Sequence, residues 1–416
     1  DKAARELKLD PLLIRKINAP EKNDTYGANS SSLTSSHLTD ALEKGAQQFS
    51  WAAKRTQSGR RNGSKVIGVG VGQAYHSAGS NGFDGLVRIT PDGKLHIHTG
   101  VGNLGTYSHS ATSRVAAEIL KYDWDNCIVE RGDSRRHLPW NFGQFGSNTS
   151  FTMTRTNFVA AQDALQKILE IAAIQIGGSP SDFDIANEKV FLKRDPSKFL
   201  GYAEVAAAAI ELGGKFSGQI APEDINDMTR RSVSALAGTG LIGVARDNLE
   251  KNATVPALAA GFIQIELDLE TGKYEILDYL GIADCGTVLH PRGLEIQVKS
   301  AAVMGFGMAG FERHAYDPQN GLPSFTGIHN SKLPTYLDVP TPMDWAATDI
   351  ADPQNPVGVK GVGEPIQGCA SAALLCAISD ALGGHTFNRV PVTADMIVNA
   401  ASGRGQSQRP LSTNTT

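Results

Sequence analysis

Residues 261–311 read GFIQIELDLETGKYEILDYLGIADCGTVLHPRGLEIQVKSAAVMGFGMAGF. Apolar and β-branched residues predict strands over 261–268 and 273–279, on either side of the turn sequence Glu-Thr-Gly. A loop over 284–291 follows, and the apolar stretch 293–311 predicts a helix. A strand pair joined by a tight turn and followed by a helix is typical of an α+β fold.

The same order occurs earlier in the chain. Strands predicted over 83–90 and 94–99 flank Pro-Asp-Gly, and a Gly-rich loop then leads into a helix near 110–121. Two copies predict two related, sandwich-like α+β units of the strand-hairpin-loop-helix type, and not one parallel sheet. The expected division is an N-terminal helix and connecting segment over 1–64, a first unit over 65–235 and a second over 236–416.

Composition excludes several classes of function. The 416 residues contain 39 Lys and Arg against 43 Asp and Glu, a net charge of −4, so no global field favours nucleic acid or an anionic membrane. No run of apolar residues is long enough for a membrane span. The 4 cysteines form no CxxC pair, so a metal in this protein is not expected to be held by thiols. The first residues lack Met and begin within a predicted helix, so we expect a piece of a longer protein.

The loop Gly100-Val-Gly-Asn-Leu-Gly105 matches the pattern G-x-G-x-x-G. In a βαβ unit this pattern binds a dinucleotide through the N-terminus of the following helix. Here the preceding strand is expected to be the second arm of a hairpin, which argues against that reading. The loop is therefore interpreted as an approach to another phosphorylated or pterin-like ligand.

The segment Gly146-Ser147-Asn148-Thr149-Ser150 precedes a helix expected over 158–177. Its hydroxyl and amide groups suit a polar heterocycle or a phosphate. Plain capping of the helix explains the same residues, and both interpretations stay open at this point.

The segment Lys360-Gly-Val-Gly-Glu-Pro365 places Glu364 at the first turn of a predicted helix over 365–382. That helix is apolar on nearly all sides, which predicts burial. A carboxylate at a buried helix start, approached through glycines, is a candidate general base. The alternative is that Glu364 only complements the helix dipole.

Taken together, these motifs resemble those of the molybdenum hydroxylases, the xanthine dehydrogenase and aldehyde oxidase family. Lys360-Gly-Val-Gly-Glu-Pro and its Ala-rich helix are similar to the family's C-terminal signature. Four further segments match in the family's order and extend the resemblance over nearly the whole chain: 9–18, 102–120, 146–149 and 284–307. The chain resembles the C-terminal half of the family's molybdopterin-binding large subunit.

This resemblance implies a molybdopterin-type cofactor, as such or in its cytosine dinucleotide form. In the family the pterin dithiolene, and no side chain, holds molybdenum. Glu364 corresponds to the catalytic glutamate, which acts as a base beside the metal. The implied cofactor contacts are Gly105, Gly146, Ser147, Thr149, Gln297, Lys360, Gly361, Val362 and Gly363.

The implied reaction is oxidative hydroxylation of an aldehyde or an N-heteroaromatic small molecule, with oxygen derived from water. Electrons are expected to pass to 2Fe–2S clusters and FAD on partner chains. Another chain is expected to carry the N-terminal half of the molybdenum subunit. The expected location is the cytoplasm, or the periplasm where a partner carries an export signal.

Three positions depart from the family's pattern. Thr106 stands where the family usually has Gln, Tyr107 stands where it has Gly, and Met304 stands where Gln is common. Pterin contacts at 106 and 304 are therefore not carried over. One alternative is a catalytically silent, cofactor-binding structural subunit, against which the retained Glu364 argues. Another is an NAD(P)-dependent dehydrogenase built on 100–105, which a bound molybdopterin would exclude.

Overall fold

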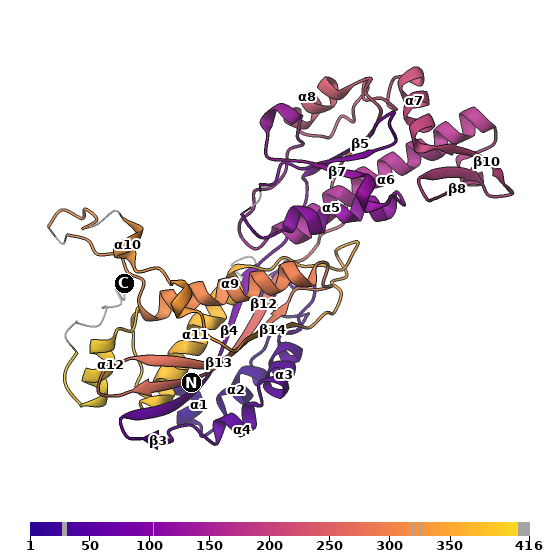
Figure 1. Ribbon diagram of the computed structural model, residues 1–416. Coiled ribbons are helices and arrows are strands. Elements are labelled where there is room, and N and C mark those ends of the chain that lie inside the picture. The colour runs from indigo at the N-terminus through magenta and orange to yellow at the C-terminus, as the bar shows by residue number, and fades with distance from the viewer. Residues whose placement is uncertain (27–30, 103, 318, 325–326, 407–416) are drawn as a thin grey trace. The chain divides into compact units, whose positions relative to one another are not determined.

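The structure is a computed structural model that describes residues 1–26, 31–102, 104–317, 319–324 and 327–406 (Figure 1). The chain forms two compact units. Unit 1 consists of Asp1–Ser77, Pro256–Ile350 and Val362–Thr416, and unit 2 consists of Ala78–Val255 and Ala351–Gly361. These units are not the contiguous ranges expected from the sequence, because β4 (Lys65–Ser77) pairs along its length with β12 (Pro256–Asp268).

Unit 1 is built on a five-stranded sheet of order β14-β13-β12-β4-β3, in which β13 and β14 are parallel and the other pairs antiparallel. Its remaining strands are β3 (Arg61–Asn62), β13 (Tyr274–Asp284) and β14 (Met343–Ala347), with the small pair β1 (Thr25–Tyr26) and β2 (Ser31–Ser32). Its helices are α1 (Lys2–Glu6), α2 (Pro11–Ile17), α3 (Leu38–Gln48), α4 (Trp51–Arg55), α9 (Pro291–Gly310), α10 (Ile328–Ser331), α11 (Glu364–Ala381) and α12 (Ala394–Ala401), with a 3-10 turn at Tyr336–Asp338.

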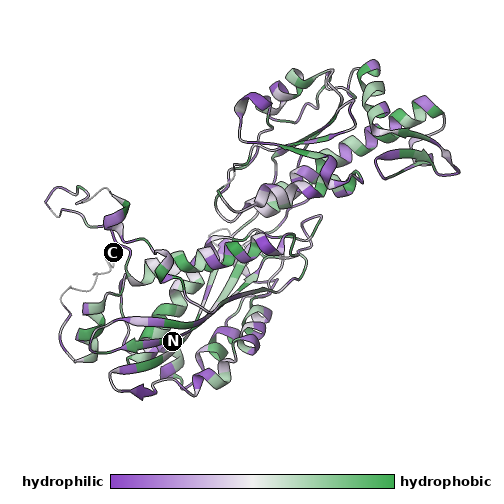
Figure 2. Ribbon diagram, viewed as in Figure 1, coloured by the Kyte–Doolittle hydropathy of each residue, from purple (hydrophilic) through white to green (hydrophobic). Residues whose placement is uncertain are grey.

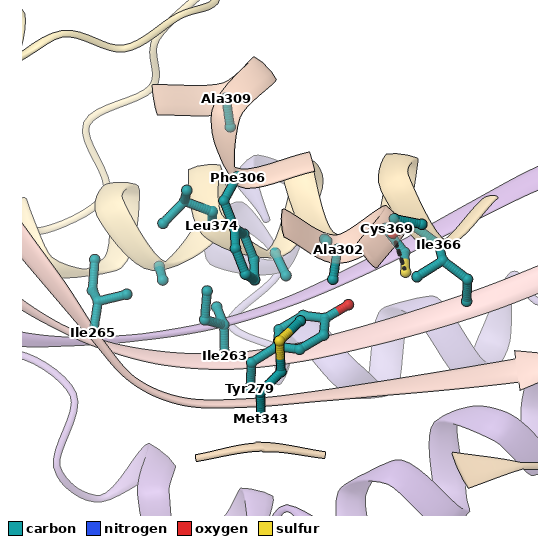
Figure 3. Packing of buried hydrophobic residues seen from close by; sticks show 14 of the residues in the cluster. Ile263, Ile265, Tyr279, Ala302, Phe306, Ala309, Met343, Ile366, Cys369 and Leu374 are labelled. Atoms are coloured by element: carbon teal, nitrogen blue, oxygen red, sulfur yellow. Dashed lines mark hydrogen bonds between the residues drawn. The ribbon is translucent and has the colours of Figure 1, made fainter. Parts of the chain in front are cut away.

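Alternation along β12 directs side chains to two cores on opposite faces of this sheet. Phe262 packs with α3 and α4, and its ring lies 5.8 Å from that of Trp51. Ile263 points to the other face, toward α9 and α11, where the rings of Tyr279 and Phe306 meet edge to face at 5.1 Å (Figure 3). α3 and α4 carry both hydrophilic and hydrophobic residues, as expected of helices with one side on a core (Figure 2).

Glycines on β4 allow α11 to pack unusually close to the sheet. A β carbon added at Gly68, Gly70 or Gly72 would lie only 2.2, 2.2 and 2.1 Å from a main-chain oxygen of α11. The three glycines alternate with valines that face the opposite core, so one face of the strand is bare backbone. This close contact fixes the position of α11, the helix that begins at Glu364.

We expect Gly70→Ala to lower the free energy of unfolding by about 3 kcal/mol, the upper end of what overpacking costs. The added β carbon meets the main-chain oxygen of Ala373, which cannot rotate away as a side chain could. Gly327→Ala is the control, because Gly327 has open space and φ −98°. Chemical denaturation of both variants is the measurement, and equal stabilities would contradict this packing.

Unit 2 contains a four-stranded sheet of order β11-β5-β6-β7 and a three-stranded antiparallel sheet of order β10-β9-β8. Their strands are β5 (Asp84–Ile89), β6 (Leu95–His98), β7 (Cys127–Glu130), β8 (Phe183–Ala186), β9 (Lys189–Leu192), β10 (Asp195–Gly201) and β11 (Leu241–Arg246). Its helices are α5 (Ser108–Ile119), α6 (Thr149–Ile176), α7 (Tyr202–Leu212) and α8 (Asp227–Leu236), with 3-10 turns at Trp124–Asn126, Ser134–Arg136 and Pro180–Asp182. α5, α6 and α7 share one core with the sheet, and α8 packs on its other face.

Each unit contains the same succession of elements, which confirms the predicted α+β class. In unit 2 the hairpin β5–β6 is followed by α5 and by β7, parallel to β6. In unit 1 the hairpin β12–β13 is followed by α9 and by β14, parallel to β13. The parallel strands were missed, since β7 and β14 are short and carry weak apolar alternation.

Candidate functional site

α11 begins at Glu364, with Gly363 at its N-cap and Pro365 in its first turn. The predicted burial of the glutamate is wrong for this chain, because the Glu364 side chain is exposed. The core-facing side of α11 runs through Ile366, Cys369 and Ala370, all fully buried. Glu364 precedes Ile366 by two residues, or about 200° around the helix, and therefore faces away from that core.

The loop before α6 has an uncommon backbone. Gly146 and Ser147 have φ of 62° and 52°, so a serine adopts the left-handed conformation next to a glycine that adopts it readily. α6 then begins at Thr149, nine residues before the helix start expected from the sequence. Ser147 and Thr149 are 8% and 9% exposed.

The asparagine at the start of α6 does not act as a side-chain cap. Asn148 holds the N-cap position of α6, and its side chain makes no capping hydrogen bond. Its amide instead donates to Ser80 Oγ at 3.1 Å, and its oxygen accepts from Thr152 Oγ1. The Asn148 side chain is therefore not a cap of α6, and for Ser147 and Thr149 both interpretations stay open.

The structure brings the loop before α6 together with the Lys360–Gly361 segment, far away in the sequence but in the same unit. Gly361 donates its N–H to the carbonyl of Ala78 at 3.2 Å. A β carbon at Gly361 would lie 1.5 Å from the carbonyl oxygen of Ser147. Only glycine permits this approach. Lys360, beside it, is fully buried.

The remaining candidates lie elsewhere in the two units. In unit 1, Gln297 is half-buried on α9, Gly363 is buried, and Val362 packs against the core around α11. In unit 2, Gly105 is exposed and has φ 85°. The loop around Gly105 includes Asn103, which lies outside the described residues.

Gln144 is a residue that sequence reasoning missed. Its oxygen accepts from the Leu104 N–H at 2.7 Å, and its amide donates to Thr106 Oγ1 at 2.6 Å. Tyr107 has φ 56°, so the loop keeps a conformation suited to glycine although tyrosine occupies the position. An amide side chain between two glycine-rich stretches was the only sequence signal for Gln144.

The context argument against a dinucleotide site at 100–105 is wrong in one respect. β6 is the second arm of a hairpin, as expected, but β6, α5 and β7 also form a strand-helix-strand unit with parallel strands. The loop thus connects a strand to a helix in a parallel crossover, so its context does not exclude a dinucleotide.

Thiols and carboxylates offer no conventional metal site in the described part of the chain. No group of three or more His, Cys, Asp or Glu side chains there could hold a metal ion. Cys369 is fully buried and donates to the Ile366 carbonyl at 3.3 Å (Figure 3). Burial raises the pKa of Cys369 to about 12, which keeps it a protonated core residue. None of the described helices is long and apolar enough to cross a membrane.

A family of molybdopterin cofactor-binding domains matches residues 44–340, and the chain belongs to this family. Among its relatives, the 6-hydroxypseudooxynicotine dehydrogenase complex subunit gamma of Paenarthrobacter nicotinovorans is 28% identical over 377 residues, covering 90% of this chain and 44% of the relative. The xanthine dehydrogenase molybdenum-binding subunit of Escherichia coli O157:H7 is 26% identical over 404 residues, covering 94% of this chain and 50% of the relative.

Solved structures share the fold. Quinoline 2-oxidoreductase from Pseudomonas putida 86 superposes with a TM-score of 0.78 at 22% identity, covering 97% of this chain and 51% of that one. A Cu,Mo-CO dehydrogenase superposes with a TM-score of 0.79 at 21% identity, and the match covers 96% of this chain and 50% of that one. The chain thus spans about half the length of the relatives it matches. Family membership favours a molybdopterin over NAD(P) as the ligand of this chain.

Proposed function

We propose that this chain is the catalytic, cofactor-binding C-terminal part of a molybdenum hydroxylase. Its reaction would be the oxidative hydroxylation of an aldehyde or an N-heteroaromatic molecule with oxygen derived from water. The observation that carries the proposal is the contact between Gly361 and Ser147. It joins two segments that the family resemblance independently assigns to the cofactor.

The described residues fit a molybdopterin. The Gly146–Thr149 loop offers hydroxyl and backbone groups at the start of a 28-residue helix. The first N–H groups of a helix have no carbonyl partner within it and favour an anionic or polar ligand. Gly361 keeps side-chain bulk away from this loop. The bound molybdenum centre would supply the two-electron oxidation. In this proposal Ser147, Thr149, Gln297, Gly105, Gly146 and 360–363 hold the cofactor in its plain or cytosine dinucleotide form.

Glu364 is the proposed general base. It follows Gly363 directly and stands in the first turn of a helix whose position is fixed by the β4 glycines. Because the Glu364 carboxylate is exposed, further protein surfaces around it are needed to exclude water from the reaction. We infer that another chain, carrying the N-terminal half of the molybdenum subunit, supplies them, and that 2Fe–2S and FAD chains accept the electrons.

The test is to purify the chain with the subunits that assemble with it and to measure molybdenum, pterin and flavin content. The complex is then assayed against aldehydes, purines and pyridines. Bound molybdopterin with turnover of one of these classes supports the proposal. Bound cofactor without turnover of any substrate would favour the catalytically silent subunit, an alternative motivated by Thr106 and Tyr107.

The loop before α6 gives a separate prediction. The double change Ser147→Ala, Thr149→Ala should lower molybdenum occupancy more than it lowers Tm, because each hydroxyl lost toward a buried heterocycle leaves a partner unsatisfied, at a cost of about 1–3 kcal/mol. Thr156→Ala is the control, since this buried α6 threonine donates only within its own helix. Unchanged occupancy with a lower Tm in the double variant would restrict the loop to a structural role.

A further inference from the structure

The segment Ala351–Gly361 lies on the first turns of α6, and one asparagine makes two hydrogen bonds to this helix. Asn355 is 6% exposed. Its amide donates to the Phe151 carbonyl at 3.1 Å and to Thr154 Oγ1 at 2.9 Å. Both acceptors belong to α6, within six residues of the start of this helix.

The oxygen of the same side chain organises the segment itself. It accepts from the N–H of Val357 at 3.0 Å and from the N–H of Val359 at 3.3 Å. An asparagine side chain has two N–H donors and an oxygen with two lone pairs. Asn355 therefore uses its full hydrogen-bonding capacity, half toward α6 and half toward the chain that leads to Lys360.

A buried arginine on α6 binds Gln354, the residue that precedes Asn355. Arg155, also on α6, is 1% exposed and pairs through Nε with Asp247 at 2.8 Å. Its Nη1 donates to the carbonyl of Gln354 at 2.5 Å. The ion pair compensates the buried charge, and the hydrogen bond from Arg155 attaches Gln354 to α6.

These contacts connect the two segments proposed to hold the cofactor. α6 begins directly after Ser147, and the segment anchored by Asn355 ends at Gly361, whose position is in contact with the Ser147 carbonyl. We propose that Asn355 is a positioning residue, which sets the register of Lys360 and Gly361 against the Gly146–Thr149 loop and thereby shapes the cofactor site. This inference rests on the proposed function, and Asn355 acts only through the backbone that it holds.

The test uses the assembled complex with Asn355→Ala, Asn355→Asp and wild type. Hydrogen exchange of the Val357 and Val359 amides, and the rate of molybdopterin release on dilution, are measured beside Tm. In Asn355→Ala we expect faster hydrogen exchange at both amides and molybdopterin release at least about tenfold faster. The substitution removes a buried side-chain amide and leaves its hydrogen-bonding partners unsatisfied. Asn355→Asp keeps the oxygen that accepts from Val357 and Val359 but removes the donors to α6. It should keep their slow exchange and still release cofactor faster.

Tyr202→Phe is the matched control in the same unit. It removes a buried hydrogen bond of 2.8 Å to the Leu120 carbonyl, remote in the chain from both segments. It should lower Tm without accelerating release. The inference is overturned if either Asn355 variant retains cofactor as wild type does, or if Tyr202→Phe accelerates release as much. Wild-type complex without molybdopterin would instead refute the proposed function, and this inference with it.

Discussion

Glu364→Gln is expected to lower kcat by at least about 100-fold, the lower end of what general-base catalysis contributes, while the complex keeps its molybdenum. Glutamine preserves the size of the side chain and removes its ability to accept a proton. The backbone at this position is held by α11, whose buried face from Ile366 onward does not involve the glutamate. The fold should therefore be unaffected. Steady-state kinetics with molybdenum analysis of the same preparation is the measurement.

Glu204→Gln is the appropriate control for this variant. Glu204 is another exposed glutamate in the first turn of a helix, where it accepts the Gly201 N–H at 2.7 Å. A role limited to the helix dipole would make the two substitutions equivalent, each costing about 0.3–1 kcal/mol of stability. A Glu364→Gln complex with full molybdenum and nearly wild-type kcat would remove Glu364 from the mechanism and favour the silent subunit.

The elements with strong periodicity could be predicted from the sequence. The hairpin β5–β6 and the helices α9 and α11 lie within two residues of the expected ranges, and β12 and β13 each extend five residues beyond theirs at one end. The strands β7 and β14 could not be predicted from the sequence, because strands of four and five residues show little alternation of apolar and polar residues. The division into two non-contiguous units could not be predicted from local sequence patterns either. Pairing of β4 with β12 is a long-range contact that no local pattern encodes.

The candidate site divides in the same way. Its residue types and segments could be named from motifs, since glycines around one carboxylate and hydroxyls before a helix are local features. The contact of Gly361 with Ser147 and the anchoring by Asn355 depend on tertiary packing. The exposure of Glu364 was missed for a different reason. The strongly apolar helix predicts burial of the helix as a whole, whereas the first residue lies off its buried face.

Gly361→Ala should have the second large effect, the loss of most bound cofactor. The β carbon would be placed 1.5 Å from the Ser147 carbonyl oxygen and 2.7 Å from that of Ala78, and neither backbone oxygen can rotate aside. The clash has to be relieved by moving the Lys360–Gly361 segment away from the Gly146–Thr149 loop. Because Asn355 and Arg155 hold the preceding residues to α6, the displacement concentrates at 360 and 361. Molybdenum content of the purified complex is the measurement.

Gly201→Ala separates this effect from a general loss of backbone freedom. Gly201 lies in the same unit with φ −72°, and the nearest atom to an added β carbon is Glu204 Oε2 at 3.6 Å, an ordinary contact. We expect this variant to retain cofactor. A Gly361→Ala complex that keeps wild-type molybdenum content would mean that the two segments can separate without harm to the site. The contact of Gly361 with Ser147 would then be a feature of packing alone, and it would no longer support the proposed function.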